Sequence, residues 1–433
     1  MPKVTLVGAG SAVFARQLMV DTLLIPGLDS GSFALVDSDP ARLELAHQLA
    51  EKVIALTGKH WTVEASTDRG QVMGGSDYVI NFIEVNGLQT VQLDHQIPMK
   101  YGVKQCIGDT IGPGGIFKAL RTGPDWLDIL HDAEEVCPSA LVLNYTNPMS
   151  ILTLAARRAT DMKVVGLCHS VQATSEQLAS YAGVAYEAMQ WRCAGINHMA
   201  WFTELTHKGQ DLYPLLKKRS SRPAFYDQDP VRFETMRQLG YFVTESSGHF
   251  SEYVPYFRKR DDLIVKYARA GYRGETGFYA SNWPAWRAAA DSHARRMLTG
   301  EAEIELRRSH EYASYIIEAR ETGVPACIHG NVLNTGLIDN LPQDGCVEVA
   351  CMVDRNGINP CHFGSLPPQL AALNQAHMAV HELIVTSLLE GNREAAVHAL
   401  MLDPLTAAVC SLEEIRHLFD EMYQAECEFI RAF

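Results

Sequence analysis

Apolar and polar positions in the first 170 residues alternate between a strand pattern and a helix pattern. Short apolar runs typical of buried strands occur at 4–7, 33–36, 78–83, 141–143 and 164–167. Between the runs, apolar residues recur at helical spacing, as at 14–24 and 41–57. Asp39 before the second of these stretches is a typical N-cap, and Gly58 after it is a typical C-cap. This alternation predicts a parallel sheet that is covered by helices on both faces.

The pattern changes in the second half of the chain, where helical spacing dominates. Helices are expected at 307–320 and 369–389, and the stretch 326–354 between them mixes strand-like runs with turn residues. The chain contains no internal repeat and no low-complexity linker, so we expect the second half to pack closely on the first. The sequence therefore predicts an α/β protein. We expect residues 1–195 to form a Rossmann-like, doubly wound parallel sheet and residues 196–433 to form a mainly α (α+β) second domain.

Composition restricts the classes of function. A net charge of −14 without a run of Lys and Arg argues against nucleic acid or an anionic membrane as partner. The chain has no stretch of apolar residues long enough to span a membrane, and Met1-Pro2-Lys3 leads directly into a strand rather than a signal peptide. Ten cysteines without a CxxC pair are typical of small buried side chains in a reducing compartment. We therefore expect a cytoplasmic protein.

The turn Gly8-Ala9-Gly10-Ser11 stands between the first strand and the first helix, as in dinucleotide-binding folds. Gly8 permits a tight turn, and Gly10 lets the backbone approach a pyrophosphate at the helix N-terminus. Val13 replaces the third glycine of the usual fingerprint, so a βαβ unit that binds nothing is the alternative. An acidic residue at the end of the next strand accepts hydrogen bonds from ribose hydroxyls and repels a 2′-phosphate. We expect NAD to be bound by Gly8, Gly10, Ser11, Asp37 and Glu84.

A thiol and an imidazole are candidate ligands for one divalent metal. Cys168 follows the apolar run 164–167 and so lies at the carboxyl end of the sheet, where ligands of open α/β sheets bind. His198 lies in the segment Gly195-Ile196-Asn197-His198-Met199. A thiolate and a neutral imidazole suit Zn, Mn, Fe, Co or Ni. Because the chain has 16 histidines, the competing explanation is a chance pair of core residues.

Two further segments are candidates for the same cleft. Asn147 follows the run 141–143, where its amide would bind a substrate hydroxyl, and the alternative is a simple Asn-Pro turn. Asp109 is the carboxylate of the glycine-dense loop 108–115, and the alternative is a loop without a role in binding.

Together these motifs resemble glycoside hydrolase family 4, the NAD- and divalent-metal-dependent glycosidases. The Cys-His-Ser-Val form of 168–171 is similar to the α-galactosidase (melibiase) branch, whereas phospho-glycosidase members typically have Asp or Asn where His169 stands. The matching segments run in order through the whole chain: 8–11, 108–115, 144–149, 168–171, 195–199, 240–247 and 336–342.

The resemblance implies that the protein hydrolyses α-galactosides by redox elimination, an exception to two-carboxylate glycoside hydrolysis. Hydride passes from the sugar C3 to NAD⁺, and the C3 ketone acidifies the proton at C2. A base removes that proton as the glycosidic oxygen leaves C1. Water then adds to the unsaturated intermediate and hydride returns to C3, so the net reaction is hydrolysis.

The resemblance also implies a metal, most often Mn²⁺ in this family, bound by Cys168 and His198 against the C2 and C3 oxygens of the sugar. Asn147 would orient the same hydroxyls. Asp109 matches an acidic position near the substrate in relatives, and we expect it to bind substrate and assist catalysis.

Proton transfer is assigned to three residues by the same resemblance. His169 occupies the general-acid position, contacts the sugar and suits the role because an imidazole titrates near neutral pH. Relatives use a Tyr as the C2 base, for which Tyr253 is the first choice here and His249 the second.

Other functions use the same motifs. A relative that acts on α-galacturonides, α-glucuronides or another hexoside is one alternative. A sugar or hydroxy-acid dehydrogenase, which accumulates NADH in proportion to substrate, is a second, and a non-catalytic NAD-binding protein is a third. The resemblance also implies a homodimer or homotetramer, since relatives are dimers or tetramers, and the long C-terminal helices offer apolar surface for such contacts.

Overall fold

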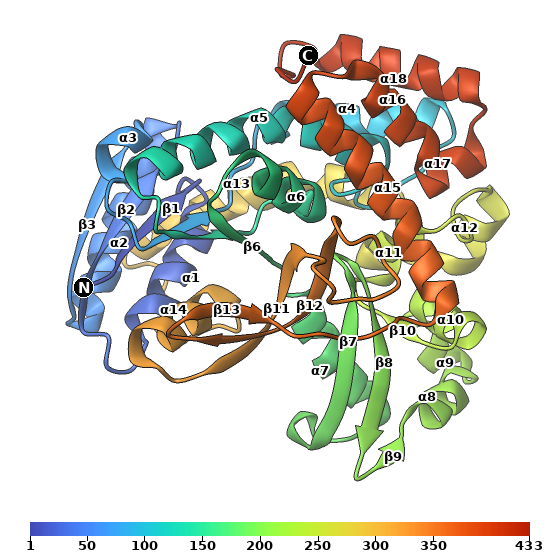
Figure 1. Ribbon diagram of the computed structural model, residues 1–433, viewed down its shortest axis with the longest axis horizontal. Helices are drawn as coiled ribbons and strands as arrows, with labels where there is room; N and C mark the ends of the chain where they lie inside the picture. The colour runs from blue at the N-terminus through green and yellow to red at the C-terminus, as the bar shows by residue number, and fades with distance from the viewer.

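The computed structural model describes residues 1–433, and its central feature is one mixed sheet (Figure 1). The strands are β1 (Lys3–Val7), β2 (Ser30–Val36), β3 (His60–Ser66), β4 (Tyr78–Asn81), β5 (Leu141–Asn144), β6 (Lys163–Leu167), β7 (Met189–Ile196), β8 (Met199–His207), β9 (Gln210–Asp211), β10 (Phe242–Val243), β11 (Ala326–Leu333), β12 (Cys346–Asp354) and β13 (Gly357–Pro360).

Helices cover this sheet on both faces. In the first half they are α1 (Ala12–Leu23), α2 (Pro40–Thr57), α3 (Arg69–Val72), α4 (Gly87–Lys100), α5 (Gly112–Val136), α6 (Met149–Ala159), α7 (Ser170–Ala182) and the 3₁₀ turn η1 (Tyr186–Ala188). In the second half they are α8 (Tyr213–Ser220), α9 (Pro223–Tyr226), α10 (Pro230–Leu239), α11 (Ser247–Tyr253), α12 (Asp261–Tyr267), η2 (Gly271–Arg273), α13 (Phe278–Thr299), α14 (Tyr312–Thr322), α15 (Pro368–Glu390), α16 (Arg393–Leu402), α17 (Pro404–Val409) and α18 (Leu412–Glu426).

The N-terminal part of the sheet is parallel, with strand order β3-β2-β1-β4-β5-β6. This is the strand order of a dinucleotide-binding Rossmann fold. Every residue of β4 and β5 is buried, as expected for strands that are covered on both faces. The predicted α/β fold with a doubly wound parallel sheet is confirmed.

Strands of the second half extend the same sheet in the antiparallel sense, in the order β11-β12-β7-β8-β10 beyond β6. The junction is the pairing of β11 with β6, where Gly330 lies opposite Leu167. The predicted boundary after residue 195 falls inside β7, and the division into two domains at that residue stays a prediction.

Local chemistry fixes several element ends. The side chain of Asp39 accepts hydrogen bonds from the backbone N–H groups of Ala41 and Arg42 at the start of α2. Gly58 ends the same helix in the left-handed conformation, as the sequence predicts. The helix expected at 307–320 is wrong at its start, because α14 begins only at Tyr312. Ser309 is instead held to α1 by its backbone N–H, which donates to Asp21 at 2.8 Å.

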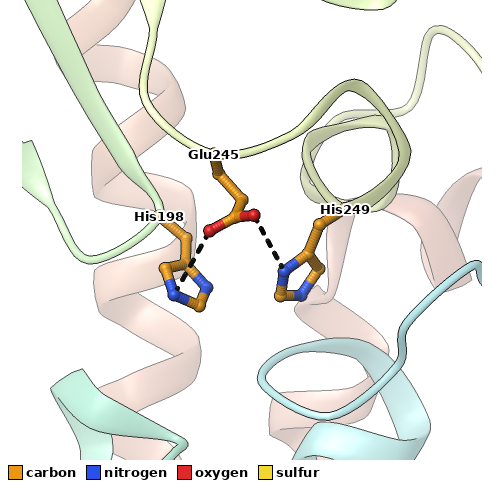
Figure 2. Close-up of side chains that lie close together, drawn as sticks. All are labelled: His198, Glu245 and His249. Carbon is orange, nitrogen blue, oxygen red and sulfur yellow. Dashed lines mark ion pairs between the residues drawn. The ribbon is translucent and has the colours of Figure 1, made fainter. Parts of the chain in front are cut away.

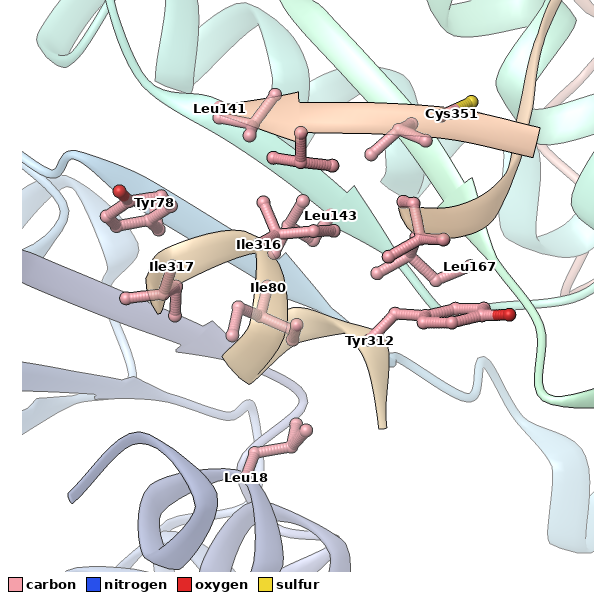
Figure 3. Close-up of a cluster of buried hydrophobic side chains, with 14 of the residues drawn as sticks. Leu18, Tyr78, Ile80, Leu141, Leu143, Leu167, Tyr312, Ile316, Ile317 and Cys351 are labelled. Atoms are coloured by element: carbon pink, nitrogen blue, oxygen red, sulfur yellow. The ribbon is translucent and has the colours of Figure 1, made fainter. Parts of the chain in front are cut away.

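The largest core cluster lies between the sheet and the helices packed on one of its faces. Figure 3 shows α14 there, with Ile316 and Ile317 against the strand residues Ile80 and Leu143. Helices α4, α5 and α6 form a second cluster with the C-terminal helices α15, α16, α17 and α18. No helix of the protein combines the length and apolar character needed to cross a membrane. A third cluster, with residues of α5 and α6, covers the opposite face of the parallel strands. Because β1, β4, β5 and β6 are parallel, their carboxyl ends lie at one edge of the sheet.

Candidate active site

A hairpin places His198 at this edge of the sheet. Strands β7 and β8 are joined by the two-residue turn Asn197-His198, and Ile196 pairs with Met199. His198 has φ 61°, a left-handed conformation that is uncommon for a residue other than glycine. The turn holds the imidazole in a buried position, 6% exposed.

Glu245 and His249 approach His198 from the loop and helix that follow β10. Glu245 also has a positive φ, 73°, and His249 lies in the first turn of α11. Figure 2 shows the carboxylate of Glu245 between the two imidazoles. Its oxygens lie 3.4 Å from Nε2 of His198 and 3.8 Å from Nδ1 of His249. Ligand atoms of all three residues fall within 4.8 Å of one another, an arrangement that fits one metal ion.

These side chains line a cavity of about 320 Å³, which we call the catalytic cavity. The cavity brings together six of the residues predicted from sequence. They are Asp109, Asn147, Cys168, His169, His198 and His249. It also contains three residues that the sequence analysis missed, Glu245, Tyr272 and Tyr279.

Among the residues predicted to bind substrate or metal or to act in catalysis, Tyr253 alone does not line this cavity. Its side chain is 1% exposed, and its hydroxyl lies 3.2 Å from Nδ1 of His198, on the side of the ring that faces away from Glu245. Burial raises the pKa of the Tyr253 hydroxyl, and the carboxylates of Glu245 and Asp109 raise it further. In this geometry Tyr253 orients His198, as partners of metal-bound histidines do.

The charges of the cavity are coupled. Burial opposes ionisation of Glu245, but His198 and His249 hold the pKa of this carboxyl well below its usual range. Burial likewise opposes charge on His249, yet the hydrogen bond with Glu245 raises the pKa of the imidazole. The pKa of Asp109 is lowered because Lys118 and His249 outweigh the effect of burial. The cavity therefore presents two carboxylates to any cation that enters it.

Cys168 reaches the cavity directly after β6, and its thiol lies 3.3 Å from Oγ of Ser170. Burial, together with the carboxylate of Glu245, raises the pKa of this thiol to about 11. A cation beside the sulfur is therefore needed to hold Cys168 as a thiolate. Nε2 of His249 is buried and makes no hydrogen bond. The same nitrogen lies 3.6 Å from a carboxylate oxygen of Asp109. This mixed set of thiol, imidazole and carboxylate donors fits a divalent transition metal.

His169 stands at the rim of the catalytic cavity, in the N-cap position of α7. Its side chain is 72% exposed, and Nδ1 lies 3.7 Å from a carboxylate oxygen of Glu311. The imidazole is therefore free to exchange protons with water and to meet a ligand at the mouth of the cavity.

A second cavity, of about 520 Å³, follows the ends of β1, β2 and β4, and we call it the dinucleotide-type cavity. It is lined by Gly8, Ser11, Asp37 and Glu84, among others. Gly8 has φ 96°, and a Cβ there would lie 2.8 Å from the carbonyl oxygen of Phe82. Gly10 does not line the cavity. Its N–H donates to Asp37 at 2.7 Å, and a Cβ would lie 2.5 Å from that carboxylate. A glycine is therefore required at position 10 because the Asp37 carboxylate occupies the space of a side chain. The extended cavity and the acidic residue at the end of β2 fit a dinucleotide.

Lys118 connects the two cavities. Its ammonium lies 2.8 Å from Glu84, in the dinucleotide-type cavity, and 4.0 Å from Asp109, in the catalytic cavity. Lys118 is 7% exposed, so both pairs are shielded from water. Lys118 was not predicted from sequence, because it lies in the second turn of α5, beyond the glycine-dense loop 108–115.

Comparison with known proteins extends these observations. The model of the family 4 glycosyl hydrolases matches residues 3–184, and the model of the family 4 C-terminal domain matches residues 193–406. An α-galactosidase of Bacillus subtilis (strain 168) is 42% identical over 436 residues, which cover 99% of each chain. An α-galactosidase of Rhizobium meliloti (strain 1021) is 36% identical over 99% of this chain and 89% of its own.

A solved structure shares the fold over its whole length. It is a 6-phospho-α-glucosidase from gut microorganisms in complex with NAD and Mn²⁺, with a TM-score of 0.82 and 19% identity over 99% of both chains. With both halves matched by the family models, the chain belongs to family 4 of the glycosyl hydrolases.

Proposed function

We propose that the protein hydrolyses α-galactosides by redox elimination, with NAD and a divalent metal, most often Mn²⁺ in this family. The observation that carries the proposal is the junction of two cavities through Glu84, Lys118 and Asp109. A sugar in the catalytic cavity lies beside the dinucleotide-type cavity on one side and the His198-Glu245-His249 cluster on the other. Relatives named α-galactosidases at 42% and 36% identity support the choice of substrate.

The residues present would hold both groups. Gly8, Ser11 and Asp37 would bind NAD, while Cys168 and His198 would bind the metal, with Glu245 and His249 within reach. When bound, NAD supplies reversible oxidation at the sugar C3, and the metal supplies positive charge beside the C2 and C3 oxygens.

The chain's own side chains position the substrate. Asn147 and Asp109 face the cavity and would hold the sugar hydroxyls by hydrogen bonds. Ionised Asp109 accepts hydrogen bonds only, so it suits a hydroxyl that donates.

Two proton transfers complete the reaction. Tyr253 is the proposed C2 base on the strength of the family resemblance, and His249, which lines the cavity, is the second candidate. His169 at the rim would protonate the oxygen that leaves C1, because it alone of the cavity histidines is largely exposed to water.

Charge distribution favours a neutral sugar over a uronide. None of the residues that line the catalytic cavity is Lys or Arg, so the carboxylate of a uronic acid would have no ammonium or guanidinium of the cavity wall to pair with. A phosphorylated sugar meets the same obstacle. The α-galacturonide and α-glucuronide alternatives are therefore less favoured.

Hydrolysis of p-nitrophenyl α-galactoside tests the proposal, with NAD⁺, Mn²⁺ and thiol reductant each omitted in turn. We expect nitrophenol release only when NAD⁺ and metal are both present, without stoichiometric NADH. Release from α-galacturonide or α-glucuronide alone would contradict the choice of sugar. Steady accumulation of NADH from a free sugar would favour a dehydrogenase.

We also propose that the enzyme works in the cytoplasm as a homodimer or homotetramer. All ten cysteines are unpaired, which suits a reducing compartment and keeps Cys168 available to a metal. Leu402 and Leu412 on the C-terminal helices are 51% and 67% exposed, and such side chains are common at subunit contacts. Light scattering of the purified protein measures the oligomeric state directly.

A further inference from the structure

Helix α11 contains a fully buried carboxylate that has no place in either cavity. Glu252 lies three residues after His249 on this helix, and its side chain is 0% exposed. It lines neither the catalytic cavity nor the dinucleotide-type cavity. A buried carboxylate is costly unless hydrogen bonds replace its contacts with water. The partners of Glu252 therefore indicate what this side chain does.

All the hydrogen bonds that Glu252 accepts come from one loop, 105–108. Its Oε1 accepts from the backbone N–H groups of Cys106 and Ile107, both at 2.6 Å. Its Oε2 accepts from the N–H of Gly108 at 3.0 Å and from Nε2 of Gln105 at 3.1 Å. Successive backbone N–H groups that point at one place form an anion-binding nest. The carboxylate of Glu252 occupies such a nest, which ends at Gly108 in the left-handed conformation, φ 70°.

This loop leads directly to Asp109 in the catalytic cavity. On one side of Asp109 stands Gly108, whose N–H is held by Glu252. On the other side, Nε2 of Gln105 also donates to the carbonyl oxygen of Ile111 at 3.2 Å. The main chain on both sides of Asp109 is therefore fixed by Glu252, once directly and once through Gln105.

A second residue of the cavity wall depends on the same loop. The N–H of Gly277 donates to the carbonyl oxygen of Gln105 at 2.8 Å, and the N–H of Tyr279 donates to that of Cys106 at 3.0 Å. Tyr279 lines the catalytic cavity. A shift of the loop would therefore move Asp109 and Tyr279 together.

Helix α11 connects the loop with the proposed metal ligands. The helix carries both His249 and Glu252, and Nε2 of His249 lies 3.6 Å from a carboxylate oxygen of Asp109. The bonds of Glu252 set the position of the loop on the helix. They therefore also set the distance between Asp109 and His249.

We propose that Glu252 is a positioning residue, whose carboxylate in the nest of loop 105–108 holds Asp109 beside His249 for contact with the substrate. The inference rests on the proposed function, in which Asp109 binds a sugar hydroxyl. Misplacement of such a group by about 1 Å lowers the rate by about 10²-fold.

Replacement of Glu252 by Gln separates the charge from the shape. Glutamine has the same shape, but its NH₂ group would face two N–H donors whichever way the amide turns. We expect kcat/KM for p-nitrophenyl α-galactoside, with NAD⁺ and Mn²⁺, to fall by about 10²-fold. The affinity for NADH, from fluorescence titration, is expected to be unchanged. Wild-type kcat/KM in this variant would overturn the inference, because a side chain of the right shape would then suffice.

Glu426→Gln is the matched control. Glu426 is also 0% exposed, but its partner is Arg121 and it makes no hydrogen bond with loop 105–108. Its replacement is expected to leave kcat/KM unchanged. Equal losses in the Glu252 and Glu426 variants would assign the effect to the loss of any buried carboxyl and would overturn the inference.

Glu252→Ala opens the nest to an added anion. Acetate matches the CH₂ and carboxylate that this change removes, and so small a ligand is expected to bind weakly, over about 10–500 mM. We expect acetate to raise kcat/KM of the variant by about tenfold or more, on the scale of hydrogen bonds to a charged group. It should also raise the Tm until the site is saturated. Acetamide, the neutral isostere, should do neither, and wild type and Glu252→Gln should not respond because their side chains occupy the nest.

The outcomes distinguish failure of the inference from failure of the proposed function. Equal effects of acetate and acetamide on Glu252→Ala, or no effect of either, would overturn the inference while the proposed function stands. If Glu252→Ala does not fold, the result for Glu252→Gln decides. If wild type with NAD⁺ and Mn²⁺ does not hydrolyse the galactoside, the proposed function fails. The Tm of Glu252→Ala then tests the nest alone: a rise specific to acetate supports it, and no rise overturns it.

Discussion

The side chains of His198 and Glu245 lie in contact, and both residues have an unfavourable backbone conformation. Nε2 of His198 lies 3.4 Å from the carboxylate of Glu245, and the two residues have φ 61° and 73°. Left-handed conformations of non-glycine residues cost on the order of 1–3 kcal/mol each and persist where the surrounding structure fixes them. The hairpin on one side and α11 on the other do so here. A free-energy cost in the backbone is expected where two side chains must reach one point, as the ligands of a metal do.

Replacement of Glu245 by Gln tests this relationship. The amide keeps the shape but removes the negative charge beside His198 and His249, so we expect Mn²⁺ to bind about 10- to 100-fold more weakly. Isothermal titration with Mn²⁺ measures the affinity without reference to activity. Glu187→Gln, at an exposed position, is the control. An unchanged affinity would remove Glu245 from the metal site.

The acidic strand end at Asp37 gives a second prediction. Asp37 faces the dinucleotide-type cavity and also accepts a hydrogen bond from the N–H of Gly10 at 2.7 Å. Asp37→Ala is expected to weaken NAD binding by about tenfold or more, on the scale of a lost pair of charge-assisted hydrogen bonds. Fluorescence titration with NADH checks this, with Glu51→Ala on the exposed face of α2 as control. Equal affinity in the variant would mean that another residue binds the ribose.

Strand ends made much of the site predictable from sequence. Cys168 and Asp37 each follow a short apolar run, and parallel strands bring their carboxyl ends to one edge of the sheet. Asp109, Asn147 and His198 were candidates from their own segments, and the family resemblance gave each a role. The structure gathers all three in one cavity with Cys168.

The features of the site that were not predicted from sequence were missed for physical reasons. Glu245 was missed because nothing in its neighbours signals a positive φ, which is set by the packing of β10 and α11. The β7–β8 hairpin was missed because its turn is Asn-His, and the usual signal of a two-residue turn is a glycine after Asn or Asp. Tyr253 was assigned to the cavity, but α11 turns its side chain behind His198. Its role as base stays a prediction.

The identity of the C2 base is decided by exchange with solvent. If Tyr253 is the base, Tyr253→Phe slows incorporation of deuterium at C2 by about 10²-fold or more, the lower end of typical general-base effects. Formation of NADH on the enzyme in a single turnover would continue, because oxidation at C3 precedes the proton transfer. Saturating Mn²⁺ compensates for the lost contact with His198. Normal exchange in Tyr253→Phe together with lost exchange in His249→Ala would assign the role to His249.

Stability is expected to depend on pH through the buried pair Asp94 and Glu426. Both carboxyls contact the guanidinium of Arg121, so one positive charge faces two acids. Burial, together with the charge of Asp94, raises the pKa of Glu426 to about 8. The folded protein therefore holds a proton that the unfolded chain loses near its ordinary pKa of about 4.5. The contribution of Glu426 to stability should be fully present below that value and be lost as pH rises toward 8.

Glu426→Gln keeps a neutral, hydrogen-bonding side chain beside Arg121, so its stability should change less across this range. Thermal unfolding of both proteins at pH 5, 6, 7 and 8 measures the difference, at about unit steps across the window set by the two pKa values. We expect the Tm of the wild type to fall relative to the variant as pH rises. Parallel curves would show that Glu426 is ionised in the folded state.

Substrates with different leaving groups distinguish a role of His169 as general acid from an unspecific loss of activity. His169 lines the catalytic cavity and its side chain is 72% exposed, so His169→Ala should cost little stability. Protonation of the leaving oxygen matters most when that oxygen is a poor leaving group. We expect kcat to fall by about 10²-fold or more for an α-galactosyl disaccharide, within the usual range for a lost general acid. Nitrophenolate leaves without a proton, so hydrolysis of p-nitrophenyl α-galactoside should fall far less. Equal losses on the two substrates would mean that His169 only binds the sugar.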